Sequence, residues 1–234
     1  MGVSSLLAVQ ELGRYFGTSR KVEAVSDPRS GVPARWLWRG VNFEVNAGDW
    51  WGIVAPSGTG KTLLLRNLVL LDPLQQGQVS YQGKPLSAWS LPLYRSQVVY
   101  LPQRAIAFSG TVQENLEQVF KLQICRERRF QVEPILDWLA QLGRGPEFLD
   151  LSGSQLSGGE MQLLALLRAL QLNPHVLLLD EPTASLDADT TRAVENLLKQ
   201  WLQQPDRACL MTSHNQQQIQ RLTSHQLALG DFTG

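Results

Sequence analysis

The stretch Ala55-Pro56-Ser57-Gly58-Thr59-Gly60-Lys61-Thr62 is the part of the chain that best predicts its fold. The apolar run Trp50-Trp51-Gly52-Ile53-Val54 precedes it, and the apolar positions of Leu63–Leu68 suit a helix. Small residues let successive backbone N–H groups turn toward a polyphosphate, and a helix N-terminus adds partial positive charge. The sequence therefore predicts a phosphate-binding loop between a strand and a helix.

Two side chains of this loop suit nucleotide chemistry. Lys61 can reach the β- and γ-phosphates, and the Thr62 hydroxyl can bind Mg²⁺. The strict pattern G-x-x-x-x-G-K-[ST] requires glycine at position 55, where this chain has Ala55. Alanine is tolerated there if its φ is negative and costs stability if φ is positive. The alternative interpretation is a Gly/Ser-rich turn that precedes a lysine by chance. The strand and helix expected on either side disfavour this alternative, because such a turn would not need them. The loop alone indicates NTP binding and leaves the class of NTPase open.

Length and composition limit the other possibilities. A chain of 234 residues forms one domain, or one domain with a lobe, and balanced charges (21 basic, 21 acidic) give no sign of a nucleic-acid-binding surface. No apolar segment is long enough to span a bilayer, and no secretory signal is evident. Cys125 and Cys209 lack metal-ligand spacing, so a reducing, cytosolic location is expected.

The order of apolar and polar segments predicts an α/β fold. Val176-Leu177-Leu178-Leu179 fits a strand buried on both faces, and alternation with helices implies a mostly parallel sheet, as in P-loop NTPases. Val41–Val45 alternates with period two, which indicates an antiparallel β segment. A helical lobe at about 104–156, with Thr111 and Glu114 forming a capping box, is expected to interrupt a core of about 1–103 and 157–234. All of residues 1–234 would then form one domain.

Polar residues follow several of these strands. Ligands in such sheets bind beyond the carboxyl ends of the strands, where Gln103, Asp180 and His214 fall. Asp180 suits Mg²⁺ coordination, and Glu181 suits a base that polarises an attacking water. A surface Asp-Glu pair before Pro182 is disfavoured, because the residues before it are apolar.

The segment Leu156-Ser157-Gly158-Gly159-Glu160 opens another helix, expected over Met161–Leu170. A serine and two glycines at a helix start form a second anion-binding N-terminus. One nucleotide needs one such site, so a second indicates contact with the γ-phosphate held by another subunit. A capped helix start would explain Ser157 and leave the two glycines without a reason.

In this order the motifs resemble those of the ABC-type ATPase family over nearly the whole chain. Residues 55–62 look like Walker A, Gln103 like the Q-loop, and Leu156–Glu160 like the family signature. Val176–Glu181 resembles Walker B with its catalytic glutamate. Ser185-Leu186-Asp187 resembles the D-loop, and His214 resembles the switch histidine.

The resemblance implies a set of roles. Catalysis would fall to Glu181, His214 and Gln103, and Mg²⁺ would be held by Thr62, Gln103 and Asp180. ATP would be bound by Phe16, by Ala55, Pro56, Ser57, Gly58, Thr59, Gly60, Lys61 and Thr62, and across the dimer by Ser157, Gly158, Gly159 and Glu160.

The resemblance also places an aromatic ring on the adenine. Phe16 stands at that position, with Tyr15, Trp36 and Trp38 as alternatives. A core aromatic is the competing explanation for Phe16. Met161 and Leu163 replace charged residues common after the signature, and Asn215 replaces a common aspartate, but these departures remove no catalytic group.

The family assignment implies an ATP-hydrolysing transporter subunit. Two copies would form a head-to-tail dimer around two ATP molecules, peripheral on the inner face of the membrane, and drive a separate integral membrane subunit. Residues Arg104–Asn115 would form the lip of the groove that receives that subunit, with Phe108 as an apolar contact, although burial in the lobe is the simpler explanation for this side chain.

Two alternatives remain. A soluble ABC ATPase acting on nucleic acid or ribosomes typically has a coiled-coil insertion or tandem ATPase domains, and a small-molecule P-loop kinase needs no Ser-Gly-Gly helix start. The segment 108–116 is similar to a bacterial subgroup linked to metal tolerance, including iron exporters. Transport specificity lies mainly in the membrane subunit, so the substrate stays open.

Overall fold

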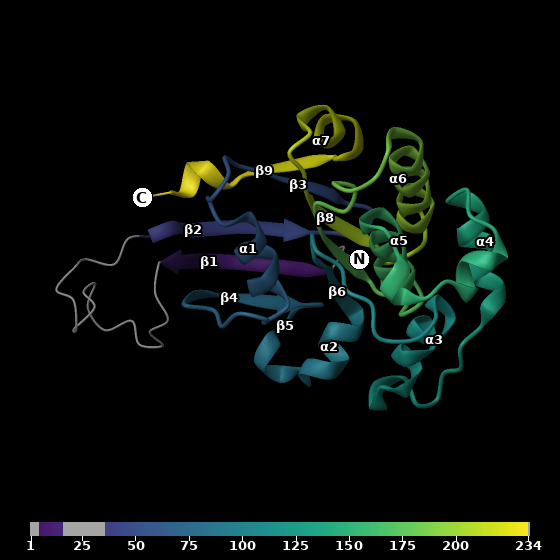
Figure 1. The fold of residues 1–234 in the computed structure, drawn as a ribbon. Helices are drawn as coiled ribbons and strands as arrows, with labels where there is room; N and C mark the ends of the chain where they lie inside the picture. Colours follow the sequence, from purple (N-terminus) through teal and green to yellow (C-terminus); the bar gives the residue numbers. More distant parts are fainter. Residues whose placement is uncertain (1–4, 16–35, 234) are drawn as a thin grey trace, which may run out of the picture.

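The computed structural model describes residues 5–15 and 36–233. They form two sheets and a group of helices (Figure 1). The antiparallel sheet has the order β2-β1-β4-β5. Its strands are β1 (Leu7–Tyr15), β2 (Trp36–Val45), β4 (Gln76–Tyr81) and β5 (Lys84–Pro85). The predicted antiparallel segment is thus longer than Val41–Val45 and pairs with β1, Leu7 opposite Val45.

The second sheet is parallel in every described pair and has the order β6-β7-β8-β3-β9. Its strands are β3 (Trp50–Val54), β6 (Val98–Leu101), β7 (Val176–Asp180), β8 (Ala208–Thr212) and β9 (His225–Ala228). The predicted α/β fold with a mostly parallel sheet is therefore confirmed.

The parallel sheet separates two apolar cores. Side chains of β7 alternate between them: Val176 and Leu178 pack toward the antiparallel sheet, and Leu177 and Leu179 pack toward the helices. This alternation is the period of two that a strand imposes, and it explains why a strand buried on both faces has consecutive apolar residues.

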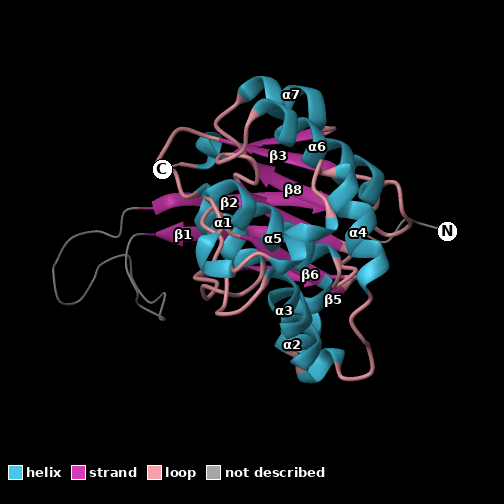
Figure 2. Cartoon of the chain, turned by 45° about the vertical axis from the view of Figure 1, so that its right-hand side comes forward, coloured by secondary structure: helices cyan, strands magenta, loops and turns pink. Residues whose placement is uncertain are grey.

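Helix α1 (Lys61–Leu68) lies in the core shared by the two sheets, with Leu64, Leu65 and Leu68 fully buried. The other face of the parallel sheet is covered by helices (Figure 2). The helices beyond α1 are α2 (Leu91–Gln97), α3 (Val112–Glu117), α4 (Val132–Gln141), α5 (Gly158–Leu170), α6 (Ala188–Leu202) and α7 (Gln216–Leu222).

The chain between β6 and β7 contributes no strand to either described sheet, and Thr111 and Ser152 form an isolated bridge there. Thr111 and Glu114 form the predicted capping box at the start of α3, which ends at Glu117 and passes into a 3₁₀ turn over Gln118–Lys121. The division into a core and a lobe at about 104–156 stays a prediction. No helix of the described residues has the length and apolar character needed to cross a bilayer.

Candidate functional site

The loop of residues 55–62 connects β3 to α1, as the sequence predicts. Gly58 and Gly60 have φ values of 81° and 93°, which favour glycine strongly, and a Cβ on Gly60 would meet Trp38 Nε1 at 3.0 Å. Ala55 is not among the described residues with positive φ, so alanine costs no backbone strain there. The departure from the strict loop pattern is therefore compatible with the loop.

The Lys61 side chain is 8% exposed and turns back into its own loop. Its Nζ donates to the carbonyl oxygens of Ala55 (2.8 Å) and Pro56 (3.3 Å). A buried ammonium requires such partners, and because it has three donors a third hydrogen bond remains available. The charge is thus held in the concave side of the loop.

Asp180 ends β7 and is 3% exposed. Thr62 Oγ1 and Tyr100 OH donate to its Oδ2 at 2.8 and 3.0 Å, and Thr212 Oγ1 donates to Oδ1 at 2.8 Å. Burial, with the Asp180 carboxylate nearby, raises the pKa of Tyr100, so the phenol stays protonated and donates. Three hydroxyl groups therefore hold the carboxylate in place against the first turn of α1.

Glu181 follows directly and has φ of 50°, a left-handed conformation that is rare for glutamate. Its backbone N–H donates to Thr212 Oγ1 at 3.0 Å. His214 Nε2 lies 2.8 Å from Glu181 Oε1, and Gln103 Nε2 donates to Oε2 at 3.1 Å. Backbone strain of this kind clusters at functional sites. The structure thus brings together the sequence-predicted residues Glu181, His214 and Gln103.

The start of α5 is exposed to solvent. Ser157 is exposed and caps α5: its Oγ accepts from Glu160 N–H (3.3 Å), while its own N–H donates to Glu160 Oε2 (2.9 Å). A Cβ on Gly159 would meet the Ser185 carbonyl oxygen at 3.0 Å and Leu186 at 3.1 Å. Gly159 therefore has a reason other than helix capping or anion binding, because it allows the close approach of residues 185–186.

The aromatic residues predicted for adenine divide into three groups. Phe16 lies outside the described residues. Trp38 is fully buried and Tyr15 nearly so, the latter against Trp36 with ring centroids 5.4 Å apart. Trp36 is half-buried, and the Arg39 guanidinium lies 5.0 Å from its ring centroid. Trp38 therefore has no exposed ring face for a base.

Sequence reasoning missed Tyr100 and Thr212. Tyr100 is in the strand that precedes Gln103, and Thr212 ends the strand before His214. Their position at the carboxyl ends of parallel strands is the signal that could have found them.

The comparisons with known proteins agree with this arrangement. The family model described as ABC transporter matches residues 38–184. The chain is 34% identical over 216 residues to "Probable iron export ATP-binding protein FetA" of Escherichia coli K12, covering 92% of this chain and 88% of that protein. It is 34% identical to "Methionine import ATP-binding protein MetN 3" of Shouchella clausii over 81% of this chain and 56% of the relative. It is 33% identical to human "Antigen peptide transporter 2", over 88% of this chain and 30% of the relative.

Solved structures show the same fold. One is the dimeric post-hydrolysis state of an ATP-binding cassette bound to ADP and Pi, with a TM-score of 0.76, 22% identity and coverage of 95% and 94% of the two chains. Another is a bacterial Atm1-family ABC exporter with ATP bound, with a TM-score of 0.76, 23% identity and coverage of 98% and 38%.

The chain is therefore a P-loop ATPase and belongs to the ABC transporter family. The predicted enzyme class, an ABC-type ATPase that binds and hydrolyses ATP, is confirmed.

Proposed function

We propose that this chain is the ATP-hydrolysing subunit of an ABC transporter that energises transport through a separate membrane subunit, with metal (iron) export as the transport reaction. The observation that carries the ATPase site is the Glu181 carboxylate, held between Gln103 and His214 beside the Asp180–Thr62 pair. The similarity to the iron export protein FetA over 92% of the chain supports the transport reaction.

In the proposed reaction, water attacks the γ-phosphorus of ATP, the bond to the ADP oxygen breaks, and ADP and phosphate leave. Glu181 accepts the proton of the water. His214 and Gln103 each occupy one of its oxygens, and the remaining lone pairs can accept that proton. Lys61 holds the phosphates with its remaining donor and with its charge.

The oxygen atoms of Thr62 and Asp180 fit Mg²⁺, because hydroxyl and carboxylate oxygens are the ligands that this hard cation prefers. Gln103 completes the proposed set through its amide. When bound, Mg²⁺ would offset the charge of the phosphate oxygens. The chain's own contribution is to hold these oxygens in position, with Tyr100 and Thr212 fixing the carboxylate.

Two partners complete the proposal. A second copy would place Ser157, Gly158, Gly159 and Glu160 over the γ-phosphate bound by the first copy.

A membrane subunit, at the inner face of the membrane, would dock at residues 104–115, where Ile106 is 68% and Phe108 52% exposed. Burial in the lobe, the simpler explanation for Phe108 from the sequence, is therefore wrong. The Arg168 guanidinium lies 5.4 Å from its ring centroid.

The substitution Glu181→Gln tests the ATPase site. An amide preserves shape but cannot act as the base, so hydrolysis should fall by roughly 100-fold or more while ATP affinity is retained. Phosphate release and calorimetric titration with ATP measure the two quantities. Glu133→Gln, an exposed carboxylate on α4, serves as the control. Wild-type turnover in Glu181→Gln would move the base role to another residue.

Affinity purification from membranes solubilised in mild detergent tests the transporter role. We expect an integral membrane protein to co-purify with the wild-type chain, and less of it with Phe108→Asp. Co-purification of ribosomes or nucleic acid instead would favour the soluble ABC ATPase.

A further inference from the structure

A buried polar network lies behind the Glu181–His214 pair and is centred on Gln218. Of the three consecutive glutamines at the start of α7, Gln216 and Gln217 are exposed, whereas Gln218 is 2% exposed. A buried amide is retained at little cost only when its donors and acceptors are paired. The contacts of this amide therefore show what it holds together.

The Gln218 amide contacts both segments that carry the predicted catalytic residues. Its Oε1 accepts from Ser213 Oγ at 2.7 Å, and its Nε2 donates to Thr183 Oγ1 at 3.0 Å. Ser213 directly precedes His214, and Thr183 stands two residues after Glu181. One side chain thus ties the backbone segments on either side of the 2.8 Å contact between Glu181 and His214.

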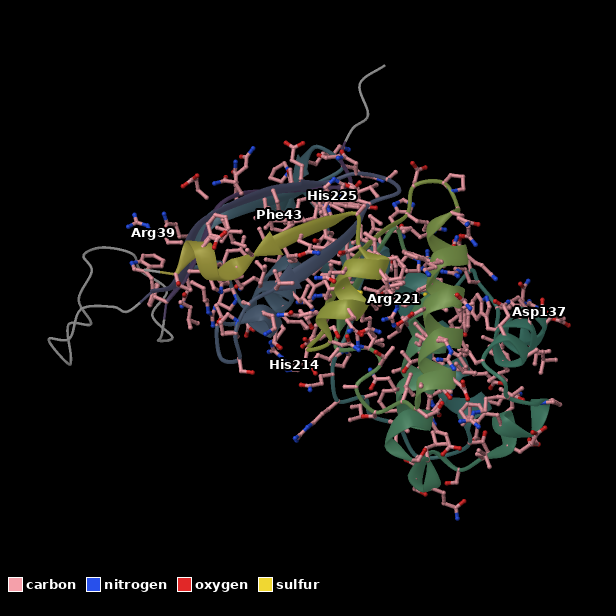
Figure 3. The ribbon with its side chains drawn as sticks, turned by 90° about the horizontal axis from the view of Figure 1, so that it is seen from above. Arg39, Phe43, Asp137, His214, Arg221 and His225 are labelled. Carbon is pink, nitrogen blue, oxygen red and sulfur yellow. The ribbon has the colours of Figure 1, made fainter. Side chains whose placement is uncertain are left out.

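The second donor of the amide reaches helix α6. Gln218 Nε2 donates to Glu195 Oε1 at 2.7 Å, and the Glu195 carboxylate is 4% exposed. Arg221, one turn further along α7, neutralises that carboxylate through its Nε and a terminal nitrogen. Arg221 lies on the side of α7 that faces α6 (Figure 3), and α6 begins at the cap residue Asp187 of the D-loop-like segment.

We propose that Gln218 is a positioning residue for ATP hydrolysis: its amide sets the distance between Glu181 and His214 and anchors that pair to helix α6. This role rests on the proposed function of Glu181 and His214. Small displacements of catalytic groups cost rate far more than affinity when the displaced groups act only in the transition state.

The substitution Gln218→Met tests the proposal, because methionine has a similar length and no strong hydrogen-bonding group. The ATPase rate of the full chain is measured with saturating and limiting ATP, well below the unfolding midpoint of every variant. We expect kcat to fall roughly 10-fold while KM and the dissociation constant for ATP change by less than about 3-fold. Gln217→Met, the exposed neighbour, is the matched control and should retain the wild-type kcat.

Arg221→Met separates positioning from stability. It removes a partner of Glu195 but touches neither Ser213 nor Thr183, so it should lower the unfolding midpoint and leave kcat within about 2-fold. Equal losses of kcat in Gln218→Met and Arg221→Met would overturn the positioning role. Unchanged kcat in Gln218→Met would overturn it as well.

A charge-swap pair covers the case in which Gln218→Met fails to fold. Gln218→Glu alone places two carboxylates together in the buried network and should lose activity. Adding Glu195→Gln restores an amide–carboxylate pair beside Arg221 and should recover most of the kcat, whereas no recovery would count against the proposal.

Glu181→Gln and His214→Ala, measured in parallel, test the proposed function itself. If they keep full activity, that function fails. If they are inactive while Gln218→Met is fully active, only the positioning role fails.

Discussion

Helices α1 and α5 both follow glycine-containing segments that the sequence marks as anion sites, but their first turns differ. In the part of the chain that the structure describes, no side chain caps α1, whose cap residue Gly60 is left-handed. At α5, Ser157 and Glu160 satisfy each other in a capping box. The first four N–H groups of a helix lack partners within the helix, so capping decides how many remain for a ligand.

This difference means that one helix start is better arranged to bind an anion within a single chain than the other. The α1 start has no side-chain cap and holds the buried Lys61 charge beside it, so this loop can bind phosphate within one chain. The α5 start is exposed to solvent and already uses part of its hydrogen-bonding capacity internally. We therefore expect the α1 loop to set ATP affinity and the α5 start to affect hydrolysis only when a second copy approaches.

Loss of the Lys61 charge should give the largest effect. Lys61→Ala removes the loop's only side-chain cation. Since a hydrogen bond to a charged group contributes about 1.5–3 kcal/mol, ATP affinity should fall roughly 100-fold. Calorimetric titration measures this, with the exposed Lys121→Ala as the control. Unchanged affinity in Lys61→Ala would contradict the assignment of the α1 loop as the phosphate site.

A bulky side chain at the α5 start should give the second effect. Ser157→Arg blocks the approach of a partner's γ-phosphate, so hydrolysis should fall about 10-fold or more while ATP affinity through Lys61 stays within about 2-fold. Sedimentation of the ATP-bound Glu181→Gln background should show the loss of the dimer. Normal hydrolysis by Ser157→Arg would mean that each chain carries a complete site.

Mixing the Lys61→Ala and Ser157→Arg proteins sharpens this test. In a dimer of one Lys61→Ala chain and one Ser157→Arg chain, one composite site carries both substitutions and the other carries neither. Partial turnover should therefore reappear on mixing. Self-contained sites would leave the mixture as inactive as its components.

The features of the site that depend on local pattern could be predicted from the sequence. The loop of residues 55–62 is recognised from the strand, glycine-rich turn and helix that follow one another there. The acidic pair Asp180-Glu181 is recognised from the apolar strand that it ends. In both cases the signal lies in adjacent residues of the chain. The contacts among Glu181, His214 and Gln103 followed from the rule that carboxyl ends of parallel strands meet.

The remaining features depend on packing between distant segments. Gly159 is small because residues 185–186 lie against it, and no local pattern shows that approach. Gln218 resembles its exposed neighbours in sequence, and only its burial and its contacts with Ser213, Thr183 and Glu195 distinguish it. Helices α2 and α7 were missed because seven residues are too few to display a helical period.

The smallest effect concerns the capping box that distinguishes α5 from α1. Hydrogen bonds from the Ser157 hydroxyl and then its backbone N–H lower the pKa of Glu160, so the folded state favours the ionised carboxylate. This stabilisation is present above the unfolded carboxyl pKa and is lost as the pH falls through the lowered folded pKa. Glu160→Ala should therefore cost about 1 kcal/mol of unfolding free energy at about pH 7, and much less at about pH 3. Urea unfolding at the two pH values measures the difference.

Glu114→Ala is the control: it removes the matching residue of the α3 capping box and shows what loss of a cap costs away from the candidate site. An equal cost of Glu160→Ala at both pH values would mean that the carboxylate does not hold Ser157 in solution. The α5 start would then keep only the bond from the Glu160 backbone N–H to Ser157 Oγ, and the contrast between the two helices would be smaller.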